Sequence, residues 1–243
     1  MSILKSSITA IVILIVFALL WATGLYLMIL SKKAHVKYDN EKVFFHAPTD
    51  ASLQKKIKNK ELPTRITDEI YSLGFWMYVE SWDNKKNQHI ISKGVGLCHQ
   101  PSIYLSKDDN KLLIKLTKNS LHDTDVCLHE DIEIPDIPIK RWVHFYMNVE
   151  RSVVNIYINS FLVTSHILKV PIKQNDDNIV VNNTNGFDGL LSKLVISNYV
   201  KENKDIKTLY NKGPYGYSIT DLFKDLYNKN KSRLSNLFDF CNR

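Results

Sequence analysis

Two cysteines and two histidines supply the residue types from which a disulfide or a metal site could be built. Cys98 precedes His99, and Cys127 stands two residues before His129. A disulfide between Cys98 and Cys127 would close a loop of about 30 residues and contribute about 3–4 kcal/mol in an oxidising compartment. The alternatives are free thiols, or a Zn²⁺ site that includes both histidines, although this spacing matches no standard zinc finger. We expect the third cysteine, Cys241, to be free.

Aspartates in predicted turns and at strand ends could supply oxygen ligands to Ca²⁺. The candidates are Asp108, Asp109 and Asp188, and Ca²⁺ takes about six to eight oxygen ligands. Aspartate is also an ordinary turn former, so the plain alternative is that these turns bind no ion. The sequence therefore predicts either no cofactor or Ca²⁺.

Aromatic side chains could stack on sugar rings. The candidates are Trp82, Tyr104, Trp142 and Tyr146. Because buried aromatic residues dominate the cores of β-sandwiches, packing is the competing interpretation for all four. Trp82 and Tyr104 stand near predicted loops, which makes them the better candidates for sugar contact.

The sequence lacks the motifs that are typical of several enzyme classes. It contains no G-x-S-x-G, H-E-x-x-H or P-loop sequence. The formal net charge of +7 is spread along the chain without a long basic run, so we expect no nucleic-acid partner. The charge fits a lysine-rich solvated surface, or attraction to anionic headgroups.

The candidate residues named above all lie after an uncharged apolar segment at 8–30. As a helix it would extend about 34 Å, enough to cross a hydrocarbon core of about 30 Å. The segment is longer than a signal-peptide core, and bulky residues at 26–30 occupy the place of a cleavage site. We therefore expect an uncleaved single-pass anchor, with the lipid bilayer as a partner. The flanking lysines differ too little in number to fix the side on which the C-terminal part lies.

Beyond residue 70 the apolar residues alternate with a period of two, as in a half-buried strand. Further short runs of strand-forming residues follow, separated by turn formers, at 88–93, 101–106, 111–117, 126–134, 141–150, 153–159, 161–168, 178–182 and 189–199. This spacing predicts an all-β protein with an antiparallel two-sheet sandwich. The run at 142–149 carries Trp142, His144 and Tyr146 opposite its apolar face, so we expect its second face to be partly covered or to line a concave surface.

Two segments show helical signals. Residues 49–59 could form one or two turns that end before Pro63. At the C-terminus, apolar residues recur at helical spacing from Ile219 to Phe238, which predicts an amphipathic helix on the sandwich, a membrane or a partner. The predicted organisation is a tail (1–7), a transmembrane helix (8–30), a stalk (31–42), a β-sandwich domain (43–214) and a C-terminal amphipathic helix (215–243).

Five stretches resemble the laminin-G-like branch of the concanavalin-A-like jelly rolls, in the order in which that family has them. They are YSLGFWMYVESW (71–82), PSIYLSKDDNKLLIKL (101–116), IPIKRWVHFYMNVERSVVNIYINSFLV (137–163) and FDGLLSKLVISNYV (187–200) with IKTLYNKGP (206–214). Ser160 replaces the usual hairpin glycine. An anchor followed directly by such a domain also resembles membrane proteins of large DNA viruses.

The resemblance implies a double sheet with one concave and one convex face, and binding more often than catalysis. Members bind sugars, glycosaminoglycans, proteins or steroids, and some hold one Ca²⁺ at the rim of the sandwich. Related glucanases carry an E-x-D-x-x-E strand. Glu130-Asp131-Ile132-Glu133 does not match that spacing, so we expect no glycosidase activity.

The sequence therefore predicts a single-pass membrane protein that displays a non-catalytic jelly roll and binds a glycan or a glycosylated protein. The alternatives are a virion or membrane scaffold that contacts a coat protein through the sandwich and the C-terminal helix, and a degenerate glycoside hydrolase. The sequons at Asn182 and Asn230 would matter only on the lumenal side of a membrane.

Overall fold

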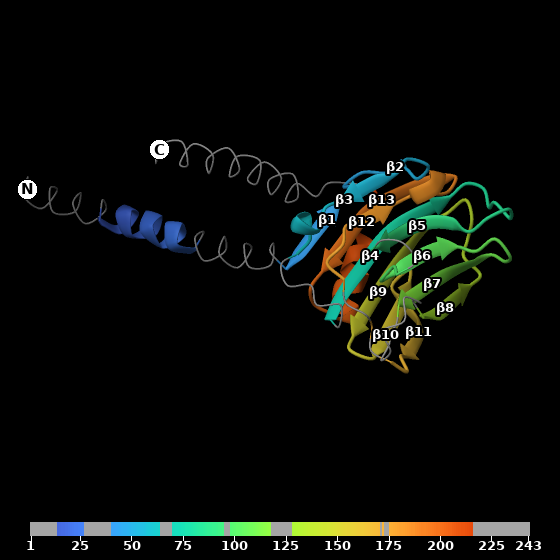
Figure 1. The fold of residues 1–243 in the computed structure, drawn as a ribbon. Coiled ribbons are helices and arrows are strands. Elements are labelled where there is room, and N and C mark those ends of the chain that lie inside the picture. Colours follow the sequence, from blue (N-terminus) through green and yellow to red (C-terminus); the bar gives the residue numbers. More distant parts are fainter. Residues whose placement is uncertain are drawn as a thin grey trace, which may run out of the picture.

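The computed structural model describes residues 14–26, 40–63, 70–94, 98–117, 128–170, 172 and 175–215. Within these ranges the chain forms two antiparallel β-sheets packed face to face (Figure 1). This arrangement confirms the predicted all-β sandwich.

The first sheet places its strands in the order β1-β13-β4-β9-β10-β11, and β2 also pairs with β13. The bounds are β1 (Glu41–Phe44), β2 (Thr49–Asp50), β4 (Ile70–Val79), β9 (Trp142–Glu150), β10 (Val153–Ile158), β11 (Phe161–Ile167) and β13 (Gly189–Ser197). Neighbours in the sheet are often distant in sequence, as for β4 and β13.

The second sheet has the order β3-β12-β5-β6-β7-β8. The bounds are β3 (Lys55–Ile57), β5 (Gln88–Lys93), β6 (Ser102–Leu105), β7 (Lys111–Thr117), β8 (His129–Pro135) and β12 (Ile179–Val181). Two short 3₁₀ helices, η1 (Asn59–Glu61) and η2 (Asn183–Asn185), and the helix α2 (Asn203–Asn211) accompany the two sheets.

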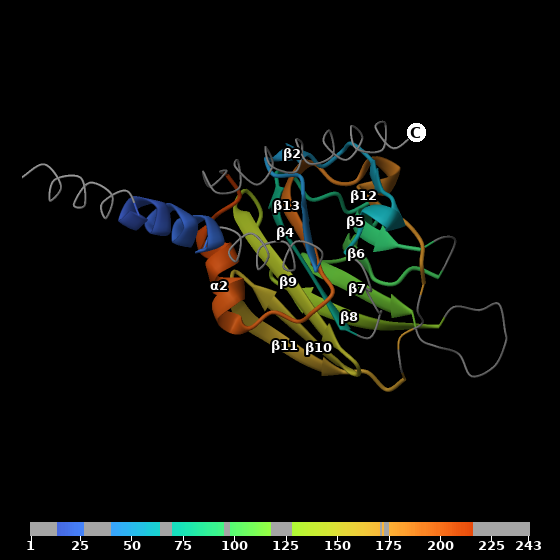
Figure 2. The same cartoon turned by 90° about the vertical axis from the view of Figure 1, so that its left-hand side faces the viewer.

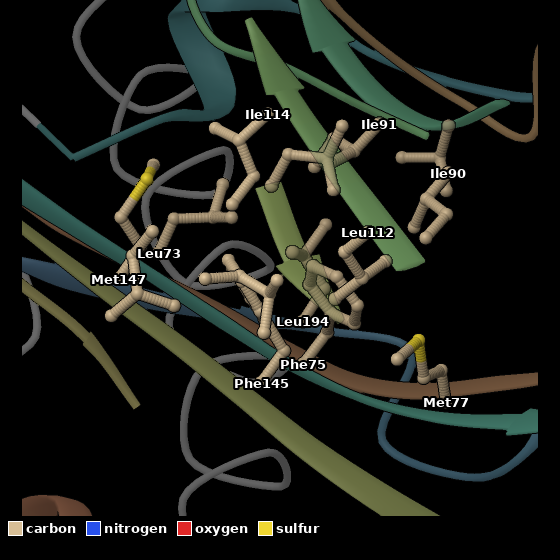
Figure 3. Close-up of a cluster of buried hydrophobic side chains, with 14 of the residues drawn as sticks. Leu73, Phe75, Met77, Ile90, Ile91, Leu112, Ile114, Phe145, Met147 and Leu194 are labelled. Carbon is tan, nitrogen blue, oxygen red and sulfur yellow. The ribbon is translucent and has the colours of Figure 1, made fainter. Parts of the chain in front are cut away.

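The core lies between the sheets because β4 and β9 each turn one alternating face inward. Phe75 and Phe145 are directly opposite each other on these two strands, and their rings stack with centroids 4.9 Å apart. Ile90 and Ile114 approach from the second sheet and are fully buried (Figure 3). The strands predicted from period-two alternation are therefore those that build the core.

The opposite face of β4 and β9 is covered by α2 (Figure 2). Ile206 of this helix is fully buried against Tyr146 and Tyr157. The ring of Tyr210 stacks on Trp76 with centroids 5.4 Å apart. The expectation that aromatic residues on this face are partly covered is thus confirmed, and the cover is a helix.

The prediction of helical turns at 49–59 was wrong. This segment holds β2, β3 and the start of η1, because pairing with β13 and β12 overrides its local helical tendency. The predicted C-terminal amphipathic helix lies, apart from Tyr215, outside the described residues.

The N-terminal described segment, residues 14–26, is helical, and its large apolar side chains are exposed. The rest of the predicted 8–30 anchor lies outside the described residues. In the ranges that the structure describes, no helix has both the length and the apolar character needed to cross a bilayer.

Two buried histidines make the fold sensitive to acid. His144 lies beneath α2 with its ring 4.9 Å from that of Trp76, and its Nδ1 atom has no hydrogen-bond partner in the described structure. On β5, His89 Nδ1 accepts a hydrogen bond from the backbone N–H of Asn183 at 3.0 Å. Burial lowers the pKa of each histidine to about 4, and the nearby His99 adds to the effect at His89.

We expect the free energy of unfolding to be largest above about pH 6.5 and to fall as the pH drops towards 4. Unfolded histidine binds a proton near pH 6.5, whereas these folded histidines bind one only near pH 4. Each should cost about 1.4 kcal/mol per pH unit in this window. Urea unfolding of the full chain between pH 7 and pH 5 measures the slope. His144→Phe should reduce it by about half, and an unchanged slope would contradict the assignment.

Candidate functional site

One end of the first sheet carries a row of side chains on its outer face. Asp50, Leu190, Tyr78 and Trp142 are direct neighbours across β2, β13, β4 and β9. The rings of Tyr78 and Trp142 lie 5.6 Å apart. Trp142 Nε1 donates a hydrogen bond to Tyr215 Oη at 2.8 Å, and the two rings meet edge to face. Three aromatic residues therefore form a continuous wall beside an acidic side chain.

Two further carboxyl groups extend this row past the strand ends. Because alternate residues share a face, Glu80 follows Tyr78 and Asp188 precedes Leu190 on the outer face. The backbone N–H of Glu80 donates to the carbonyl of Asp188 at 2.9 Å. The Ser81 hydroxyl donates to Asp188 Oδ2 at 2.5 Å. The strand ends thus hold both carboxyl groups at one place.

An open pocket of about 410 Å³, which we call the rim pocket, lies at these strand ends. Its lining residues are Asp50, Ser52, Tyr78, Glu80, Asp188, Gly189 and Leu190. Gly189 allows β13 to approach β4 closely here, because a Cβ atom at position 189 would lie 1.9 Å from the carbonyl oxygen of Tyr78.

The rim pocket is acidic, although the whole chain has a formal net charge of +7. Hydrogen bonds from Ser52, including its backbone N–H at 2.8 Å, lower the pKa of Asp50. The pKa of Tyr78 is raised by burial, and further by the charge of Glu80 and a hydrogen bond to it. Tyr78 therefore keeps its hydroxyl proton at neutral pH. The pocket combines carboxylate acceptors with an aromatic ring, which suits a ligand rich in hydroxyl groups.

The carboxyl groups of β8 are arranged differently. Asp131 Oδ2 accepts from Lys115 Nζ at 2.8 Å, and Glu133 Oε2 accepts from Lys111 Nζ at 3.0 Å, both on the outer face of the second sheet. Glu130 points the other way and contacts His166 Nε2 at 2.6 Å. Asp131 and Glu133 therefore share the outer face of β8, and each is engaged by a lysine.

The four predicted sugar-stacking residues are not brought together. Trp142 lies beside the rim pocket, whereas Tyr146 is fully buried under α2 and offers no surface to a ligand. Trp82 packs against the core and donates a hydrogen bond to the Ser106 carbonyl at 2.8 Å. Tyr104 is half-buried on the second sheet, 5.2 Å from the ring of His89. Of the two favoured candidates, Trp82 packs against the core and Tyr104 lies on the other sheet, away from the rim pocket.

The predicted calcium ligands are also separated. Asp108 and Asp109 lie in the exposed turn between β6 and β7, near Lys107 and Lys111 respectively. Asp188 lies in the rim pocket of the other sheet. Within the described ranges, no three His, Cys, Asp or Glu side chains are placed to hold a metal ion. The sequence analysis grouped Asp108, Asp109 and Asp188 as calcium candidates, and the fold places the first two on one sheet and the third on the other.

The remaining candidates concern covalent modification. Cys98 is disulfide-bonded, but Cys127 lies outside the described residues, so the Cys98–Cys127 pairing stays a prediction. Asn182 is fully buried, with its Nδ2 group directed to the Leu53 carbonyl at 3.4 Å. This sequon therefore has no room for a glycan in the folded chain. Asn230 lies outside the described residues.

Of the seven residues that line the pocket, sequence reasoning named only Asp188, and it missed Asp50, Tyr78 and Glu80 among the others. One signal was available, because positions 78 and 80 continue the alternation that places Trp76 on the outer face. The position of Asp50 was not readable, since it depends on the pairing of a two-residue strand with β13.

Comparison with known protein families matches residues 54–207 to the concanavalin A-like lectin/glucanases superfamily. A search of curated proteins finds no match. Among solved structures, the receptor binding domain of botulinum neurotoxin C/D mosaic serotype has a TM-score of 0.53 and 14% identity, with 71% of this chain and 46% of that domain covered. The binding domain of botulinum neurotoxin DC in complex with SialylT has a TM-score of 0.51 and 17% identity, with 72% and 47% covered. The chain spans less than half the length of either domain, and these likenesses concern the fold.

Proposed function

Since the chain belongs to the concanavalin A-like lectin/glucanases superfamily, we propose that it is a membrane-anchored, non-catalytic module that binds a glycan or the glycan of a glycoprotein at the rim pocket. The observation that carries this proposal is a pocket of about 410 Å³ lined by three carboxyl groups and the ring of Tyr78, which Trp142 extends on one side. A sugar presents hydroxyl donors along its edges and an apolar ring face, and this pocket offers a partner for each.

Two further observations support binding without catalysis. One structural neighbour, the binding domain of botulinum neurotoxin DC, was solved in complex with SialylT. The two same-face carboxylates of β8, Asp131 and Glu133, are each engaged by a lysine ammonium group. A glycosidase needs such a pair free to flank the scissile bond.

The membrane anchor is part of the proposal. Large apolar side chains of residues 14–26 are exposed on the described helical segment, and the uncharged stretch continues on both sides in the sequence. Burial in lipid would remove this surface from water. We propose a single-pass membrane location, with the virion membrane as one compartment suggested by the resemblance to membrane proteins of large DNA viruses.

Glycan binding can be tested with the full chain in lipid nanodiscs on a glycan array. We expect specific hits, and we expect Glu80→Gln to weaken the affinity for those glycans about tenfold or more, because it replaces a charge-assisted acceptor by a neutral one. Glu133→Gln is the matched control, since it removes a carboxylate from the other sheet and should leave the affinity unchanged.

Three outcomes would argue against the proposal. Equal losses from both variants would remove the rim pocket as the site. Silence on the array with co-purification in a stable particle would favour the scaffold that contacts a coat protein. Hydrolysis of a bound β-glucan that Glu133→Gln abolishes would make the protein an enzyme.

The anchor can be tested separately by washing membranes with alkaline carbonate. We expect the full chain to stay in the membrane pellet and a chain lacking residues 8–30 to be released, because only the apolar stretch is expected to enter lipid. Release of the full chain would remove the anchor from the proposal. Protease protection in sealed vesicles then shows which side the sandwich faces.

A further inference from the structure

The rim pocket carries negative charge that the described residues do not neutralise. Its carboxyl groups belong to Asp50, Glu80 and Asp188, and its lining includes no lysine, arginine or histidine. The ion pairs formed within the described ranges include none of these three groups. Hydrogen bonds from Ser52 lower the pKa of Asp50 more than the charge of Lys55 does. The pocket therefore attracts a cationic group.

The chain that follows α2 is fixed beside this pocket. Ser192 Oγ, which is buried on β13, donates a hydrogen bond to the carbonyl of Pro214 at 2.9 Å. Tyr215 Oη then accepts a hydrogen bond from Trp142 Nε1 at 2.8 Å. The Trp142 ring lies 5.6 Å from the ring of Tyr78, which lines the pocket. The last described residue of the chain thus stands two ring contacts away from the pocket.

The sequence that continues from Tyr215 carries the opposite charge. Residues 226–238, which we call the basic segment, contain Lys229, Lys231 and Arg233 and no aspartate or glutamate. They lie outside the described residues. The 14 residues from Tyr215 to Lys229 would extend about 21 Å as a helix and about 46 Å as an extended chain. Two ring contacts of 5.4 and 5.6 Å separate Tyr215 from the pocket, so either conformation is long enough to reach it.

We propose that the basic segment lies over the rim pocket of its own chain, with its three cations against the pocket carboxyl groups, and that a glycan must displace it. A single exposed ion pair contributes little to stability. Three cations on one segment act together, however, and the tether at Tyr215 keeps their local concentration in the millimolar range. The regulation of binding rests on the proposed function of the pocket, whereas the contact itself does not.

The consequence for binding follows from the fraction of time for which the pocket is uncovered. The apparent affinity for a ligand falls in proportion to that fraction. A pocket that is covered for most of the time would bind its glycan about three- to tenfold more weakly than an open one. Because salt screens exposed charges, the cover should loosen as the ionic strength rises.

The contact can be tested without any glycan by carbodiimide cross-linking of the full chain in mild detergent. This reagent joins a lysine amine directly to a carboxyl group that touches it. We expect peptide mapping of the monomer band to find Lys229 or Lys231 joined to Asp50, Glu80 or Asp188, and we expect high salt to abolish these links. The exposed Lys60 is the internal control and should not be joined to a pocket carboxyl group.

The regulation can be tested by changing the three cations of the basic segment to glutamine in the full chain. In lipid nanodiscs, this triple variant should bind the glycans found on the array about three- to tenfold more tightly than the parent chain. The matched control changes Lys60, Lys169 and Lys207 to glutamine, which removes the same charge at exposed positions that do not line the pocket. Its affinity should equal that of the parent chain.

The outcomes separate this inference from the proposed function. Glycan binding without the cross-links, or with links confined to a dimer band, would overturn the inference and leave the function intact. Cross-links without any glycan binding would remove the function and, with it, the regulation. Unchanged or weaker binding by the triple variant, or equal gains in both variants, would show that the basic segment does not compete with the glycan.

Discussion

The outer face of the first sheet depends on the contact between Tyr146 and Gly74. A Cβ atom on Gly74 would lie 2.1 Å from the Tyr146 ring, so the ring rests directly on the β4 backbone. Its hydroxyl lies 2.8 Å from Ser72 Oγ, and it packs with Tyr157 and Ile206. Because glycine leaves room for this ring against the β4 backbone, Ile206 of α2 can pack on Tyr146 and Tyr157. The chain beyond the helix then reaches Trp142, where Tyr215 completes the aromatic wall.

Alternation revealed much of this fold, and its failures have physical causes. The strands from β4 to β13 were predictable because burial between two sheets imposes a period of two on the sequence. The two faces of β9 were distinguishable, but the helix covering one of them was not, since nothing local shows that Ile206 meets Tyr146. In the same way, the side chain of Tyr146 could be read as a ligand contact until its cover was known.

The rim pocket was hidden for a related reason. Asp50, Glu80 and Asp188 come from three segments that are distant in sequence and are brought together by the pairing of β2 and β4 with β13. Local signals even favoured helical turns around Asp50, and long-range hydrogen bonding overrode them. The acidic residues that were noticed, Asp108 and Asp109, belong to a turn of the opposite sheet. Residue spacing in a sequence can reveal a site whose residues belong to one strand. The residues of the rim pocket belong to β2, β4 and β13 or their ends, so their spacing in the sequence does not reveal it.

The position of β1 has a mechanical consequence. This strand is the first that the structure describes, and it is held to β13 by residue pairs that begin at Glu41 and Ser197. A pull from the N-terminal side would open this ladder one pair at a time, starting at Glu41. The Glu41 carboxylate accepts hydrogen bonds there from Ser197, Tyr199 and the buried Lys201. Because Lys201 stands two residues before the start of α2, tension on the N-terminal segment would be transmitted to the helix that covers the sheet.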